Sequence, residues 1–173
     1  GIRDYKVTGV QTCALPIYLV KKLILPVLLL ITASGCIRIQ QFEQNIQIPE
    51  NAWSYAFEPQ IKFDITDTTS TYNVFVTLRH TDAYAYRNIW LDIATKQPGD
   101  TSFQKGRFEL TLQESSGKWM GTGYGGIWEV RYPLFKQIRF KKSGQYTILL
   151  RQIMRDDPLM HIMNAGIRIE KAS

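Results

Sequence analysis

Residues 146–154, with the sequence YTILLRQIM, form the stretch that decides the fold of this chain. Apolar or uncharged side chains occupy both alternating faces of the run, Tyr146, Ile148 and Leu150 on one face and Thr147, Leu149 and Ile153 on the other. A strand at the edge or surface of a sheet shows one polar face, whereas only Arg151 and Gln152 interrupt this run. We therefore expect a strand in the middle of a sheet, paired on both sides.

The rest of the chain from Ala52 onward alternates largely with a period of two, the pattern of half-buried β-strands. Runs of this kind cover residues 53–57, 61–65, 72–80, 89–93, 108–112, 138–141 and 167–169. Turn signals separate them at intervals of about 8–12 residues, as in β-sandwiches. The sequence therefore predicts an all-β fold, a single antiparallel β-sandwich of jelly-roll-like topology, although periodicity does not determine the strand order.

Upstream of this region, residues 21–36 read KKLILPVLLLITASGC, which is the layout of a secretory signal: two lysines, a short apolar run and small residues. The run is too short to span a bilayer, which needs roughly 20 apolar residues. A buried core helix is the alternative, but a lysine pair directly before an apolar run without a polar face argues against it. Ala33, Ser34, Gly35 and Cys36 resemble a bacterial lipobox. We expect a lipoprotein signal peptide over 18–35, cleavage before Cys36 and lipid attachment at Cys36.

Residues 1–17 do not fit this layout, because a signal peptide should begin just before its lysines. The segment 7–17, VTGVQTCALPI, resembles a sequencing-adaptor sequence translated in frame. We interpret residues 1–17 as foreign to the natural protein, the alternative being an authentic N-terminal extension. In the resulting division, residues 36–50 form a tether and a first edge segment, and residues 51–173 form the sandwich domain.

Composition limits what the mature chain can do. Four of the 21 basic residues and one of the 15 acidic residues precede Cys36, which leaves 17 against 14 and a net charge of +3. This balance, together with the absence of RNA-binding motifs, argues against a nucleic-acid partner. Cys36 is the mature chain's single cysteine, so acylation there leaves no disulfide and the core alone must stabilise the domain. The mature chain is long enough for one such domain.

Catalytic and metal-binding patterns are missing from the sequence. His80 and His161 have no cysteine or second histidine at ligand spacing, and the turn at 156–158 explains the adjacent Asp156 and Asp157. There is no nucleophile elbow and no phosphate-binding glycine loop. We expect no enzyme activity, no metal, no small-molecule ligand and no cofactor beyond the covalent lipid on Cys36.

The segment 117–133, GKWMGTGYGGIWEVRYP, is unusually rich in glycine and aromatic residues. One interpretation is a bulged strand that crosses between the two sheets with its aromatic side chains in the core. The other is an interaction surface made of Trp119, Tyr124, Trp128 and Arg131. Exposed tryptophans on a sandwich could also stack on sugar rings, so a carbohydrate-binding lipoprotein is the alternative function.

Three blocks, YRNIWLDI (86–93), GKWMGTGYGGIWEVRYPL (117–134) and GQYTILLRQIMRDDPLMHIMNAGIRIEK (144–171), resemble the gliding-motility lipoproteins of the GldH type from Bacteroidetes. The resemblance implies a non-enzymatic cell-envelope lipoprotein that supports gliding and the associated type IX secretion machinery through protein–protein contacts. Its implied partners are the membrane, through N-terminal acyl chains, and other motility or secretion proteins. No run of acidic residues follows Cys36, which favours an outer-membrane position facing the periplasm.

Lipid attachment can be tested directly. The mature protein should begin at Cys36, carry palmitate label and accumulate as a larger precursor when globomycin inhibits signal peptidase II. Cys36→Ala should abolish the label, because the thiol that receives the lipid is gone. A soluble, unlabelled product cut at another position would contradict the assignment.

Overall fold

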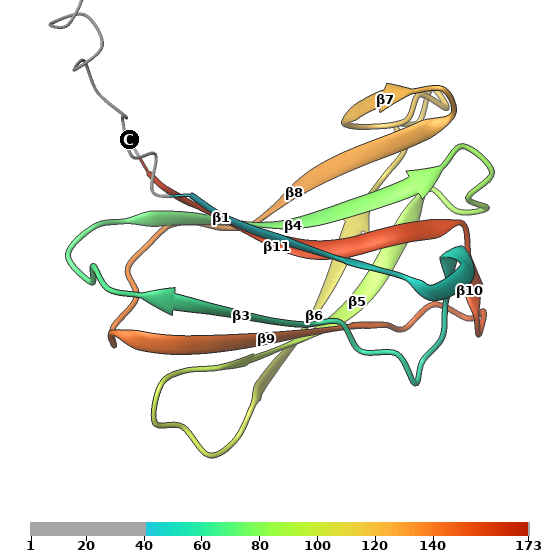
Figure 1. Ribbon diagram of the computed structural model, residues 1–173. Helices are drawn as coiled ribbons and strands as arrows, with labels where there is room; N and C mark the ends of the chain where they lie inside the picture. The colour runs from blue at the N-terminus through green and yellow to red at the C-terminus, as the bar shows by residue number, and fades with distance from the viewer. Residues whose placement is uncertain (1–40, 173) are drawn as a thin grey trace, which may run out of the picture. The chain divides into compact units, whose positions relative to one another are not determined.

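The computed structural model describes residues 41–172, which form two antiparallel β-sheets packed face to face (Figure 1). The five-stranded sheet has the order β1-β11-β4-β8-β7, the four-stranded sheet has the order β3-β9-β5-β6, and β2 pairs with β10. The strands are β1 (Gln41–Gln47), β2 (Ala52–Trp53), β3 (Gln60–Ile65), β4 (Tyr72–Thr81), β5 (Asn88–Lys96), β6 (Gln104–Thr111), β7 (Thr122–Tyr124), β8 (Ile127–Ile138), β9 (Gly144–Gln152), β10 (Leu159–Met160) and β11 (Ile162–Lys171), with a 3-10 turn, η1 (Pro49–Asn51). The predicted signal peptide and Cys36 lie outside the described residues.

The eight longer strands follow the pairing order of a jelly roll. The first pairs with the eighth (β1 with β11), the second with the seventh (β3 with β9), the third with the sixth (β4 with β8) and the fourth with the fifth (β5 with β6). Two further pairings, β11 with β4 and β9 with β5, join these four strand pairs into two sheets. A long antiparallel ribbon rolled up in this way is a jelly roll. The predicted antiparallel sandwich and its jelly-roll-like topology are confirmed.

Strand β9, which holds the run 146–152, lies in the middle of its sheet between β3 and β5, as predicted. Its inward face is buried, with Leu150 entirely shielded from solvent and Tyr146 and Ile148 nearly so. On the outward face Thr147 is buried and Leu149 is half-buried. Because both faces are largely covered, this strand carries apolar residues on both, unlike most of its neighbours.

Aromatic rings close the core at the end of the sandwich where β1 begins. The ring of Phe63 stacks on Tyr146 with centroids 5.5 Å apart, and Phe140 meets Tyr146 edge-on at 4.9 Å. Phe42 and Tyr72 complete the cluster, so rings from both sheets meet there. Residues 41–172 contain no cysteine, and burial of this kind is therefore the main source of stability.

Two predicted strands are wrong. Of the run 53–57 only Trp53 lies in a strand, at the end of β2, because the chain then turns and the indole Nε1 of Trp53 donates to the carbonyl oxygen of Phe57 at 2.8 Å. In the run 138–141, Ile138 ends β8, and Phe140 is buried although it lies in the following turn. A loop can therefore bury an apolar side chain such as Phe140 at the spacing of a strand, whereas Tyr55 in the first run is exposed.

The sandwich has two distinct ends, a proximal end where β1 begins and a distal end where the β7–β8 hairpin projects. At the proximal end, β1 begins opposite Glu170 of β11, and the turns that follow β3, β5 and β8 lie beside it (Figure 1). There the amide of Ala172 donates to the carbonyl oxygen of Thr71, and Lys142 forms an ion pair with Asp100. At the distal end, the β4–β5 turn meets the β7–β8 turn, where the amide of Asp82 donates to Gly126 at 2.8 Å.

The central position of β9 leads to a stability test. Leu150→Ala should lower the free energy of unfolding by about 2–5 kcal/mol, since it removes buried methyl groups and leaves a cavity. Lys141→Ala is the control, because this side chain is exposed in the β8–β9 turn and its loss should change stability by less than about 0.5 kcal/mol. Urea denaturation measures both. Equal small effects would contradict the assignment of β9 as the central strand.

Candidate interaction surface

The glycine-rich segment forms a hairpin at one edge of the five-stranded sheet. Strand β7 pairs only with the first three residues of β8, and the turn consists of Gly125 and Gly126 with φ of +60° and +79°. Such left-handed backbone angles favour glycine, which explains the glycine pair between two strands. The interpretation of 117–133 as one bulged strand crossing between the sheets is therefore wrong.

Two of the predicted surface residues are partly withdrawn from solvent. Trp119 is half-buried, with its ring 4.7 Å from that of His80 and 6.4 Å from that of Tyr84. Trp128 is half-buried over Gly123, where an added Cβ would lie 2.5 Å from the indole. Both indoles are only half-exposed, so neither is the fully open aromatic surface that stacking on a sugar ring favours. This geometry gives the carbohydrate-binding alternative no support.

His80 helps to hold the base of the hairpin to the core. It is fully buried, and its Nδ1 donates to the carbonyl oxygen of Thr81 at 2.8 Å. Burial lowers the pKa of His80, with a smaller opposing effect from the bond to Thr81, so the ring is neutral at pH 7. Within residues 41–172, no group of three or more His, Cys, Asp or Glu side chains is placed to hold a metal ion.

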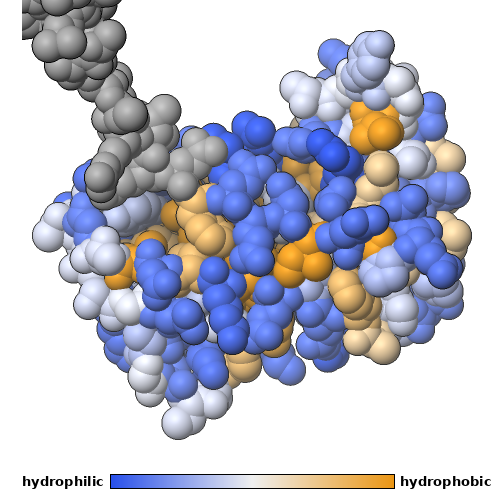
Figure 2. Space-filling model, viewed as in Figure 1, coloured by the Kyte–Doolittle hydropathy of each residue, from blue (hydrophilic) through white to orange (hydrophobic). Residues whose placement is uncertain are grey.

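The tip of the hairpin, in contrast, is open to solvent. Tyr124 is 95% exposed and Ile127 is 38% exposed. Figure 2 shows a small hydrophobic spot among pale and hydrophilic residues at the upper right, where Figure 1 places the β7–β8 hairpin. A pocket of about 380 Å³ lies against this tip, lined by Arg79, Thr122, Gly123, Tyr124, Ile127 and Glu129. The tip thus combines exposed apolar surface with a hollow that has charged walls.

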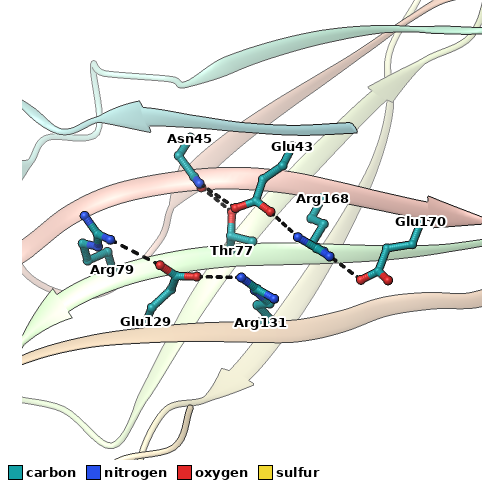
Figure 3. Close-up of polar contacts among 8 residues, drawn as sticks. All are labelled: Glu43, Asn45, Thr77, Arg79, Glu129, Arg131, Arg168 and Glu170. Atoms are coloured by element: carbon teal, nitrogen blue, oxygen red, sulfur yellow. Dashed lines mark hydrogen bonds and ion pairs between the residues drawn. The ribbon is translucent and has the colours of Figure 1, made fainter. Parts of the chain in front are cut away.

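Arg131, the fourth predicted surface residue, lies on the outward face of the five-stranded sheet. Its guanidinium contacts Glu129 at 3.2 Å, and the same carboxylate contacts Arg79 of β4 at 3.3 Å (Figure 3). The pairing of β4 with β8 explains why these charged side chains lie together, because Arg79 is directly opposite Glu129 and Thr77 is directly opposite Arg131. The ion pairs connect the outer face with the pocket at the hairpin, because Arg79 and Glu129 also line that pocket.

A second ion-paired group on this face was not predicted from the sequence. Arg168 of β11 contacts Glu43 of β1 at 2.6 Å and Glu170 at 2.7 Å, and its side chain is only 13% exposed (Figure 3). The bond to Glu170 raises the pKa of Arg168 against the effect of burial. Partial burial would raise the pKa of Glu43, but hydrogen bonds from Arg168 and Asn45 lower it below its usual value.

Gly166 permits the close packing beside this group. A Cβ added at Gly166 would lie 2.2 Å from Oδ1 of Asn45 and 2.7 Å from Oγ1 of Thr77. Because that side chain is missing, the hydroxyl of Thr77 donates to Asn45, whose amide donates to Glu43 at 3.0 Å. Alternation in β11 could have placed Arg168 and Glu170 on one face, but only strand pairing brings Glu43 to them.

The fold and this surface define the class of protein: an all-β jelly-roll domain with an ion-paired outer face and a projecting hairpin. The model of one family, GldH lipoprotein, matches residues 40–169. This chain therefore belongs to the GldH lipoprotein family, as the three sequence blocks predicted. The expectation of a lipid-anchored cell-envelope protein linked to gliding motility is confirmed at the level of the family.

Among residues 41–172, no helix has the length and apolar character needed to cross a membrane.

Two relatives carry the same description. The gliding motility lipoprotein GldH homolog of Christiangramia forsetii is 26% identical over 150 residues, covering 83% of this chain and 91% of the relative. The gliding motility lipoprotein GldH of Flavobacterium johnsoniae is 28% identical over 129 residues, covering 70% and 79%. Among solved structures, a non-crystalline cellulose specific carbohydrate-binding module is 10% identical over 75% of this chain and 70% of its own, with a TM-score of 0.38, a similarity too loose to carry an argument.

The two ion-paired groups should differ in their contribution to stability. Arg168→Ala should lower the free energy of unfolding by about 1–3 kcal/mol at pH 7, because Glu43 and Glu170 lose a shielded, charged hydrogen-bond donor. Arg131→Ala is the control: its side chain is 49% exposed, and an exposed ion pair contributes less than about 1 kcal/mol.

The effect of Arg168→Ala should also depend on pH. Since the pKa of Glu43 is lowered by folding, its contribution is complete above its ordinary pKa of 4.5 and is lost as the pH falls through the folded pKa. The difference in stability between the natural protein and Arg168→Ala should therefore shrink in acid, as measured by urea denaturation at neutral and acidic pH. An unchanged difference would contradict the role assigned to Glu43.

Proposed function

We propose that this protein is anchored through lipid on Cys36 and supports gliding motility, and the type IX secretion tied to it, by contacting other envelope proteins through its β7–β8 hairpin. Membership of the GldH lipoprotein family supports the link to gliding. The observation that carries the mode of action is the exposed pair Tyr124 and Ile127 at the distal end of the sandwich. The protein acts as a binding component rather than as an enzyme.

The short tether gives this proposal its geometry. Four residues lie between Cys36 and Gln41, and the five Cα–Cα steps from Cys36 to Gln41 span at most about 18 Å when fully extended. Lipid on Cys36 would therefore keep the proximal end of the sandwich close to the membrane. Strand β8 has 12 residues and spans roughly 40 Å from this end to the hairpin turn. The hairpin would then be presented to partners well away from the lipid surface.

The chemistry of the tip indicates what a partner must offer. Tyr124 and Ile127 supply apolar contact area, and tyrosine is among the residues that dominate binding energy at protein interfaces. Arg79 and Glu129, in the adjoining pocket, supply charges of both signs. A complementary partner therefore has an apolar recess bordered by polar groups. We place this partner in the periplasm, on the inner side of the outer membrane, because no acidic run follows Cys36.

The contact can be tested in a gliding host that lacks its own copy of the gene. Complementation with Tyr124→Ala/Ile127→Ser should fail to restore colony spreading and type IX cargo secretion. In pull-downs from native envelopes, this variant should recover at least about tenfold less of the motility or secretion proteins that the natural protein recovers. A tenfold loss of affinity corresponds to about 1.4 kcal/mol. The variant should keep its melting temperature, because both side chains are exposed.

The matched control is Trp90→Ala, which removes a partly exposed aromatic side chain from β5 of the other sheet. This variant should support normal spreading and recover the same partners. Normal spreading and undiminished pull-down by the hairpin variant would overturn the proposal. Retardation of the purified protein in polysaccharide gels, abolished by Trp119→Ala or Trp128→Ala, would instead establish the carbohydrate-binding alternative.

A further inference from the structure

The proximal end of the sandwich carries an excess of positive charge. Lys136, Arg139 and Lys141 are exposed there, at the end of β8 and in the turn after it, and none forms an ion pair with another described residue. Two carboxylates at this end are already engaged by lysines, Asp67 by Lys171 and Asp100 by Lys142. Asp64 is also exposed at this end, but the three basic side chains outnumber it, so the proximal end has an excess of positive charge.

The distal end has the opposite balance. Apart from the ion pairs Arg79–Glu129 and Arg151–Glu58, its acidic residues are Glu50, Asp82, Glu114, Asp156 and Asp157, and its basic residues are Arg87, Lys118 and Arg155. The mild net charge of the mature chain therefore conceals a separation of charge along the sandwich. An anionic surface would attract the proximal end and repel the distal end.

Apolar side chains lie directly beside the basic ones. A pocket of about 190 Å³ is lined by Phe63, Val74, Phe135, Ile138, Phe140 and Tyr146. Arg139 and Lys141 line the same pocket. Phe135 is 38% exposed, so part of this apolar lining reaches solvent. A pocket with apolar walls beside unpaired cations suits a lipid, which offers a phosphate next to hydrocarbon.

We propose that the proximal end is a docking surface for anionic phospholipid, in which Lys136, Arg139 and Lys141 contact lipid phosphates. The length of the chain before β1 supports this occupant, because lipid on Cys36 would hold this end within about 18 Å of the bilayer. In this respect the inference rests on the proposed anchor. The surface adds a second attachment, which orients the sandwich with its hairpin directed away from the membrane.

The test uses residues 37–173 without lipid, so that acylation plays no part. The compact unit comprises residues 39–173 and contains the entire buried core, and it is therefore expected to fold without the preceding segment. Sedimentation should show binding to vesicles of phosphatidylglycerol and phosphatidylethanolamine, but not to vesicles of phosphatidylcholine alone. Binding should weaken with added salt, because the contacts are between exposed charges.

Lys136→Gln/Arg139→Gln/Lys141→Gln should reduce vesicle binding by about 100-fold, since each basic group near an anionic surface contributes roughly fivefold. Arg87→Gln/Lys118→Gln/Arg155→Gln is the matched control, because it removes three positive charges from the distal end and should bind as the natural sequence does. Thermal unfolding checks that both variants fold.

Equal losses in the two triple variants would overturn the proposal, because they would show a response to net charge alone. Failure of the natural sequence to distinguish the two kinds of vesicle would also overturn it. Neither result would bear on acylation of Cys36 or on the hairpin, which are tested by palmitate labelling and by spreading.

Discussion

Packing between the inward faces of the two sheets is the interaction on which the rest of this structure depends. The described chain has no cysteine, so the rolled ribbon is held by burial and by strand pairing alone. Strand β9 lies at the centre of one sheet and β4 at the centre of the other, and each buries a full row of apolar side chains against the opposite layer. The roll closes where the first strand pairs with the last, which brings chain segments more than a hundred residues apart into register.

This closure also creates the proximal and distal ends, to which we assign the two proposed contacts. Because β1 begins beside the end of β11, the segment that follows Cys36 joins the sandwich among the basic turns. Because β8 runs the full length of its sheet, the hairpin that precedes it lies at the opposite end. The proposed membrane contact and the proposed partner contact would thereby lie at opposite ends of the sandwich. A jelly roll suits such a component, since its turns gather at two ends and can vary without disturbing the core.

The outward face of the five-stranded sheet carries two ion-paired groups that differ in how far they are shielded from solvent. Arg168 is shielded and bonded to two carboxylates, and these contacts tie β1 to β11 at the point where the ribbon closes. Arg131 and Arg79 share Glu129 in a more exposed arrangement that contributes little to stability and leaves charged groups beside the hairpin. At the base of the hairpin, Trp119 packs on the buried ring of His80. A firm base with an exposed tip is an arrangement expected of a contact element rather than of a flexible loop.

The sequence by itself determined the class of fold, the central position of β9 and the family, because burial imposes a period of two wherever a strand lies between core and solvent. It also placed Trp119, Tyr124, Trp128 and Arg131 in one glycine-rich segment. Only the tertiary structure decided which of them are open: Tyr124 is exposed beside a turn of two left-handed glycines, whereas Trp119 packs on His80 and Trp128 is half-buried over Gly123. The ion pair of Glu43 with Arg168, the jelly-roll strand order and the separation of charge between the two ends depend on contacts between distant segments. Local periodicity reports only whether a side chain is buried, and not which segment buries it.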